Sequence, residues 1–152
     1  LGLPQAVEQL IQLFGERGKL HGTFSMEGEH YTLPKHVEIA IFRIVQEALN
    51  NVVHHAKTDK VRVRMHYTSQ ALTVLIADDG VGFDPSHLTE ELEESDDALD
   101  METQRRLRGR HFGVIGMEER AKIIGAAIQI LSEPGKGTKV HLRVQNRMVE
   151  EN

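Results

Sequence analysis

The 152-residue sequence contains no cysteine and no tryptophan. Without cysteine the chain has no disulfides and no thiolate chemistry, which is compatible with the cytoplasmic location that we expect. No apolar run is long enough to span a membrane and no signal peptide opens the sequence, so we expect this chain itself to lie outside the membrane. The first residue is Leu1 rather than methionine, which predicts a fragment of a longer parent protein that can still be membrane-anchored.

Basic residues are fewer than acidic ones. Against 23 Asp and Glu there are 18 Lys and Arg, and the formal net charge is −5. This balance gives no electrostatic footprint for nucleic acid, so we expect no nucleic-acid partner. The length suits one domain with one core, which we place at residues 1–147, followed by a C-terminal tail at residues 148–152.

Residues 39–57 predict one uninterrupted helix, because they contain neither glycine nor proline and carry apolar residues at helical spacing. At about 100° of rotation per residue, Glu47, Asn51 and His55 lie together on the flank of the apolar face, whereas Asn50 points away. Polar groups at such an edge are costly to bury unless a ligand or a metal ion satisfies them. The alternative is an amphipathic helix whose polar edge is simply solvated.

The remaining elements follow from apolar spacing. Further helices are expected at residues 4–17 and 117–124, and strands at residues 20–26, 61–67, 72–77, 127–130 and 140–144. The strands at 61–67 and 72–77 predict an antiparallel hairpin whose second strand is the more central one. The fold class is therefore α+β: a two-layer α/β sandwich in which a mixed, mostly antiparallel sheet carries helices on one face.

A long polar segment at residues 84–110 separates the two halves of the pattern. Its first half is acidic, at residues 90–100, and its second half is basic, with Arg105, Arg106, Arg108 and Arg110. A segment of this length inside a compact domain is usually a functional lid or disordered, and this one has enough leucines to hold a helix. The alternative is a solvated tether whose charges do nothing specific.

Three glycine-containing turns follow the polar helix: DDGVGF at 78–83, FGVIG at 112–116 and PGKGT at 134–138. Each turn alone is weak evidence, because glycine turns more often make hairpins than phosphate sites. Two glycines one residue apart after a strand do indicate a tight backbone passage close to another group.

Taken in order, QEALNNVVHHA, DDGVGF, HFGVIGMEERA and PGKGT resemble the ATP-binding catalytic domain of bacterial sensor histidine kinases. They match that family's asparagine box, first glycine box, lid-closing glycine box and last box. The wider group includes gyrase, the ninety-kilodalton heat-shock chaperone and the MutL mismatch-repair protein, which share the Bergerat-type ATP-binding fold. The amino-acid sequence of the third box most resembles that of the subfamily whose response regulators are of the NarL type.

The resemblance implies that the chain binds ATP and Mg²⁺ and donates the γ-phosphoryl group to a histidine. That histidine would lie on a separate dimerisation domain of the same parent, because neither His21 nor His36 heads a convincing phosphoacceptor helix. A NarL-type response regulator would be the downstream partner. The alternatives are an ATPase or serine kinase of the same fold, of the anti-sigma type, and a non-catalytic nucleotide-sensing docking module.

The resemblance also assigns roles on the long helix. Asn51 would hold Mg²⁺, and Glu47 would lie beside the γ-phosphate or a metal-bound water, so both are catalytic and metal-binding candidates. His54 stands where the family usually has Lys or Arg against phosphate, and a histidine is only partly charged near neutral pH. His55 would line the nucleotide pocket; its alternative is a histidine that merely packs at the helix edge.

The first glycine box would hold the base. Asp78 would accept a hydrogen bond from the adenine amino group, while Asp79 points away because strand residues alternate sides. The alternative for Asp78 is an aspartate that only caps the turn. Gly80 and Gly82 would let the backbone pass under the base, and Thr138 would support the adenine through Asp78 or a water.

The later box would hold the phosphates. Gly113 and Gly116, with Val114 and Ile115 between them, would open a helix whose free N–H groups face the phosphates. Residues 83–112 would form the ATP lid, whose arginines we expect to fold onto the phosphates. Met117 and Arg120 are expected to be structural.

Overall fold

The computed structural model describes residues 2–87 and 101–147. The predicted acidic half of the polar segment and the predicted tail at 148–152 lie outside the described residues. Among the described residues, no helix combines the length and the apolar character needed to cross a membrane.

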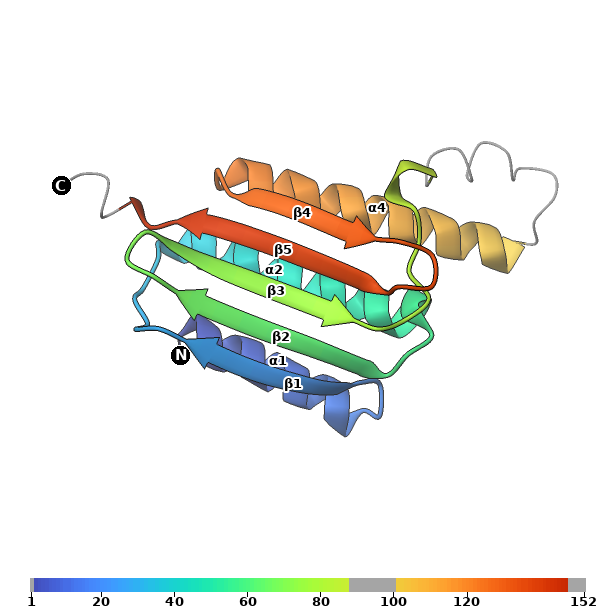
Figure 1. The fold of residues 1–152 in the computed structure, drawn as a ribbon, viewed down its shortest axis with the longest axis horizontal. Helices are drawn as coiled ribbons and strands as arrows, with labels where there is room; N and C mark the ends of the chain where they lie inside the picture. Colours follow the sequence, from blue (N-terminus) through green and yellow to red (C-terminus); the bar gives the residue numbers. More distant parts are fainter. Residues whose placement is uncertain (1, 88–100, 148–152) are drawn as a thin grey trace.

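The described chain forms a sheet covered by helices on one face, as the sequence predicts (Figure 1). The helices are α1 (Leu3–Glu16), α2 (Lys35–Asn51) and α4 (Met101–Ile123), with a π-helical turn at Val52–Ala56 and a 3-10 turn at Pro85–His87. The strands are β1 (His21–Glu27), β2 (Lys60–Tyr67), β3 (Ala71–Asp78), β4 (Ala127–Ser132) and β5 (Thr138–Gln145). Figure 1 shows all three helices on the same side of the sheet, which confirms the predicted two-layer architecture.

The sheet has the strand order β1-β2-β3-β5-β4. Among the strands of the described residues only the β1–β2 pair is parallel. The β2–β3, β3–β5 and β4–β5 pairs are antiparallel, so the sheet is mixed as predicted. The β2–β3 hairpin forms, and β3 is the central strand. Its buried Leu72, Val74 and Ile76 face the helical layer together with alternate residues of β2.

The core lies between the sheet and the helices because each element contributes one apolar face. In α2 the buried residues are spaced three and four apart, from Val37 through Ile41 and Ile44 to Ala48. In β2, Val61, Val63, Met65 and Tyr67 are buried while the residues between them are exposed. The helix–sheet packing is what brings the carboxyl end of α2 beside the end of β3.

The helix predicted at 39–57 differs from the structure at its end. The α-helix ends at Asn51, and a π-helical turn carries the chain through Val52–Ala56 to Lys57, which adopts left-handed backbone angles (φ 55°). The carbonyl of Ala56 accepts a hydrogen bond from Val81 N–H at 2.8 Å. The end of the helix is therefore tied to the corner that follows β3, a tertiary contact that helical periodicity does not reveal.

The helix predicted at 117–124 begins much earlier. It starts at Met101, so the part of the predicted lid from 101 to 112 is helical and Gly113 and Gly116 lie inside α4. The expectation that these two glycines open a helix is wrong. A glycine within a helix costs only about 1 kcal/mol relative to alanine, and packing of α4 on α2 can offset this.

Candidate functional site

Asp78 ends the central strand β3 and is buried, with 7% of its surface exposed. Its Oδ1 accepts a hydrogen bond from Gly80 N–H at 2.8 Å. Burial raises the pKa of Asp78 above its ordinary value, and hydrogen bonds from the backbones of Gly80 and Thr138 oppose this shift. Asp78 thus does cap the turn, as the plainer interpretation proposed, but it also lines a pocket. Asp79 is exposed, as predicted.

The two glycines after Asp78 have packing reasons of their own. A side chain at Gly80 would overlap the carbonyl of Ala56, at the end of the π-helical turn. Gly82 has a φ of +63°, and a side chain there would overlap the carbonyl of Glu133 in the β4–β5 turn. These glycines let the corner after β3 fit between two other segments, and their contact with a base stays a prediction.

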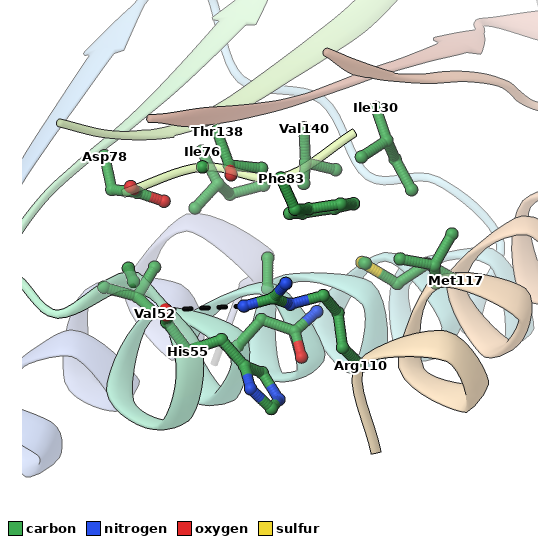
Figure 2. Close-up of a pocket in the computed structure, with 15 residues that line it drawn as sticks. Val52, His55, Ile76, Asp78, Phe83, Arg110, Met117, Ile130, Thr138 and Val140 are labelled. Atoms are coloured by element: carbon green, nitrogen blue, oxygen red, sulfur yellow. Dashed lines mark hydrogen bonds between the residues drawn. The ribbon is translucent and has the colours of Figure 1, made fainter. Parts of the chain in front are cut away.

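An apolar pocket lies between α2, α4 and the sheet beside Asp78 (Figure 2). Asp78 and Thr138 are paired across β3 and β5 and supply polar atoms from the sheet side. Thr138 Oγ1 lies 2.8 Å from Ser132 Oγ. The pocket has a volume of about 30 Å³, and it is lined by Ala48, Asn51, Val52, His55, Ala56, Ile76, Asp78, Gly82, Phe83, Arg110, Val114, Met117, Ile130, Thr138 and Val140.

Several of these lining residues escaped sequence reasoning. Ile76 and Val140 could have been found, because each lies two residues from a predicted site residue on the same strand and so faces the same side. Met117 was expected to be structural; it is fully buried and also lines the pocket. Phe83 was noted only as the end of the first glycine box and Arg110 only as a lid arginine. Phe83 N–H donates to Ser132 Oγ at the end of β4, and Arg110 reaches the pocket from α4, so the place of each depends on tertiary packing.

A second, polar cleft of about 770 Å³ adjoins this pocket. Its lining residues are Glu47, Asn50, Asn51, Val53, His54, His55, Glu102, Arg105 and Gly109. Asn51 and His55 line both compartments, so the polar edge predicted from helical spacing does form the boundary between them. Asn50, which helical geometry placed on the far side, also lines the polar cleft, and that part of the prediction is wrong.

Gly113 brings α4 against the polar edge of α2. A side chain at Gly113 would overlap Glu47 Oε1 and would lie 3.3 Å from Asn51 Oδ1. The carboxylate and the amide oxygen therefore face the same small volume beside a helix backbone. Val114 lines the apolar pocket, whereas Ile115 lines a separate groove beside β4 and Gly116 lines neither compartment.

The two oxygen-bearing side chains suit a hard cation. Burial raises the pKa of Glu47 above its ordinary value, while the charges of Arg120 and His54 oppose the shift. The described residues contain no cluster of three or more His, Asp or Glu that could hold a metal ion on its own. Magnesium usually takes only one or two protein oxygens and completes its shell with water and phosphate, so Glu47 and Asn51 fit that ion.

Comparison with known proteins shows which family the sequence matches. Residues 36–148 match the family described as histidine kinase-, DNA gyrase B- and HSP90-like ATPase. The chain is 33% identical over 144 residues to the signal transduction histidine-protein kinase/phosphatase DegS of Brevibacillus brevis, covering 95% of this chain and 32% of that protein. It is 28% identical over 143 residues to the sensor histidine kinase LiaS of Bacillus subtilis, covering 94% and 34% respectively. The chain thus spans about a third of the length of these relatives.

Solved structures share the fold. The histidine kinase domain of the blue-light activated histidine kinase EL346 from Erythrobacter litoralis aligns with a TM-score of 0.61 at 17% identity, covering 95% of this chain and 65% of that one. Full-length ShkA, solved in complex with AMPPNP, aligns with a TM-score of 0.68 at 14% identity, covering 95% and 30%. The predicted fold class is confirmed.

Proposed function

Because the chain belongs to the histidine kinase-, DNA gyrase B- and HSP90-like ATPase family, we propose that it is the Mg–ATP-binding catalytic domain of a sensor histidine kinase. The observation that carries the proposal is the junction of two compartments at Asn51 and His55: an apolar pocket with a buried carboxylate, and a polar cleft. This division matches a nucleotide, which has a flat base at one end and a charged triphosphate at the other.

The base belongs in the apolar pocket. Asp78 offers a buried carboxylate there, and an exocyclic adenine amine is a donor that only an acceptor can satisfy. Burying the carboxylate is costly in the free protein, as its raised pKa indicates. A hydrogen bond from the base would return part of that cost, which favours adenine over bases that present a carbonyl at the same position.

The triphosphate belongs in the polar cleft. Arg105 and His54 line it from opposite helices and can face phosphate oxygens. Asn51 and Glu47 would hold Mg²⁺, with phosphate and water completing its shell. When bound, the metal ion supplies charge neutralisation for the transferred phosphoryl group.

The cleft contains the parts that phosphoryl transfer needs from a positioning domain. Such a transfer is catalysed mainly by orientation and electrostatic stabilisation. The nucleophile would be a histidine on a separate dimerisation domain of the parent protein, which docks at the open cleft. The names of DegS and LiaS support a kinase, and a response regulator of the NarL type is the partner that we propose downstream.

Two measurements test this function. Calorimetry should show Mg-dependent ATP binding by the chain alone. Addition of the matching dimerisation domain in trans should then produce acid-labile phosphohistidine on that domain. Binding without transfer would support a docking module instead, and phosphorylation of a serine would support the anti-sigma type of kinase.

A further inference from the structure

The face of the sheet that points away from the helices is positively charged. Figure 1 shows α1, α2 and α4 together behind the sheet, so no helix of the described residues covers the side chains on its other face. On β2 and β5 these side chains alternate with buried core residues, as the pleat of a strand requires. The basic face consists of Arg62, Arg64 and His66 of β2 and Lys139, His141 and Arg143 of β5.

The charge of this face is opposite to that of the whole chain, whose formal net charge is −5. Across the same stretch of the sheet, the described residues add one carboxylate to the face, that of Glu27 on the edge strand β1, opposite His66. No arginine or lysine of the basic face takes part in a salt bridge within the part of the chain that the structure describes. Solubility does not require charges of one sign to gather on one side, so the pattern favours an anionic partner.

The register of the sheet arranges the basic side chains in two rows with an uncharged row between them. The middle row belongs to β3, on which Thr73 and Leu75 are half-buried and Ala77 is buried. The three lines of paired residues across the sheet are Arg62–Ala77–Lys139, Arg64–Leu75–His141 and His66–Thr73–Arg143. Each line therefore has a basic side chain on both sides of an uncharged one.

The dimensions of this pattern match those of an α-helix. The rows on β2 and β5 are two strand spacings apart, about 9.5 Å, and successive lines follow each other at about 6.7 Å along the strands. An α-helix is about 10–12 Å across, and residues four apart lie about 6 Å apart along its axis. A helix lying along β3 can thus place an apolar stripe on Leu75 and carboxylates on both flanks over the basic rows.

We propose that the basic face docks an acidic amphipathic helix of a partner protein, which lies along β3 between the rows of β2 and β5. A bilayer spreads its anionic headgroups evenly and a nucleic acid duplex has no apolar stripe to place on Leu75, so a helix with two acidic flanks fits the pattern better. The proposal does not depend on nucleotide binding, because the proposed nucleotide pocket lies on the helical side of the sheet (Figure 2).

Nuclear magnetic resonance titration of the ¹⁵N-labelled chain, without nucleotide, tests the proposal. One probe is a designed helical peptide whose leucine stripe is flanked by glutamates on both sides. The other is an isomer of the same composition in which the leucines form no stripe. The first peptide should shift the backbone amides of Thr73 and Leu75 and bind more weakly as salt is added. No shift on this face, or equal binding of the two isomers, would overturn the proposal.

Charge reversal shows which cations bind the peptide. The double variant Arg62→Glu, Lys139→Glu reverses both ends of one line and should weaken peptide binding at least about tenfold, because two attractions become repulsions. The control is Lys19→Glu, Lys122→Glu, which makes the same change in net charge at two exposed cations outside the basic face. The control should bind as wild type does, and thermal denaturation should show that both variants are folded. Equal weakening by the two double variants would mean that only net charge matters, which would contradict a docking site on this face.

Phosphatidylserine vesicles and duplex DNA, titrated in the same way, test the other anionic partners. Both should shift the amides of Thr73 and Leu75 less than the striped peptide does. Stronger binding of either one to the basic face would overturn the acidic helix as its partner.

Discussion

Gly113 of α4 packs so closely on Glu47 of α2 that any side chain at Gly113 would overlap the Glu47 carboxylate. This contact fixes how near the two helices approach at the boundary between the apolar pocket and the polar cleft. The sequence predicted a different role for Gly113, namely the opening of a helix that faces the phosphates. In the structure its role is to let a helix backbone lie against the proposed metal-binding oxygens.

Gly113→Ala should weaken Mg–ATP binding by about 10–100-fold, the range seen when groups that support metal ligands are disturbed. The added methyl group pushes against Glu47, and Asn51 Oδ1 lies only 3.3 Å from its position. Overpacking of this kind costs about 1–3 kcal/mol, which cancels the gain in helix propensity of about 1 kcal/mol. Calorimetry and chemical denaturation measure the two effects.

Gly109→Ala is the matched control on the same helix. A side chain at Gly109 would meet no atom within 4 Å. This variant should therefore raise the free energy of unfolding by up to about 1 kcal/mol. Gly109 also lines the polar cleft, but a side chain there touches neither Glu47 nor Asn51, so Mg–ATP affinity should change much less than in Gly113→Ala. If the two alanine variants bound Mg–ATP with the same affinity, the close contact of Gly113 with Glu47 would not matter for nucleotide binding.

Asp78→Asn should lower ATP affinity by tenfold or more while the protein stays folded. The amide presents a donor where the base amine needs an acceptor, and hydrogen bonds to charged groups contribute about 1.5–3 kcal/mol. Asp79→Asn removes the same charge from the exposed neighbour and should change affinity little. Wild-type affinity in Asp78→Asn, with circular dichroism unchanged, would remove Asp78 from the base site.

Asn51→Ala should abolish the magnesium dependence of ATP binding, because the amide oxygen is one of two proposed protein ligands. Residual binding by the apolar pocket should remain and should be similar with and without the metal. Asn50→Ala is the comparison, since Asn50 lines only the polar cleft. ATP titrations of both variants with and without Mg²⁺ test this prediction. If Asn51→Ala kept the magnesium dependence of ATP binding and Asn50→Ala lost it, Asn50 rather than Asn51 would be the magnesium ligand.

Stability of the ligand-free protein should fall as pH rises above the ordinary carboxyl range. Burial raises the folded-state pKa of Glu47 and of Asp78 above ordinary values of 4.5 and 3.8. Their contribution to stability is therefore fully present below about pH 4 and is lost as pH rises through the raised values. Urea denaturation of wild type at several pH values between 4 and 8 measures this decline.

The double variant Glu47→Gln, Asp78→Asn isolates these two groups from other titrating side chains. It should show a smaller decline over the same pH range, and its stability relative to wild type should rise with pH. A parallel pair of pH profiles would mean that neither carboxyl group is held above its ordinary pKa.

Much of the site was readable from the sequence because its determinants are local. Helical spacing is set by a few neighbouring residues, and it correctly put Glu47, Asn51 and His55 on one edge. The prediction that Asp78 lines the site and Asp79 points away also holds, although not through strand alternation: β3 ends at Asp78, Ala77 is buried as well, and Asp79 is exposed in the corner that follows. Helical spacing failed for Asn50, because a wide cleft accepts side chains from more than one side of a helix.

The sequence by itself determined the two-layer fold and the polar helix edge, since both follow from apolar periodicity and chain order. Only tertiary structure decided the π-helical turn before Lys57, the approach of α4 to α2 and the entry of Arg110 into the pocket. Each goes with a contact between segments distant in sequence: Ala56 with Val81, Gly113 with Glu47, and Arg110 with Phe83. The early start of α4 was missed for another reason: residues 101–112 carry helix-forming side chains but no clear apolar stripe, so apolar periodicity gives no signal there.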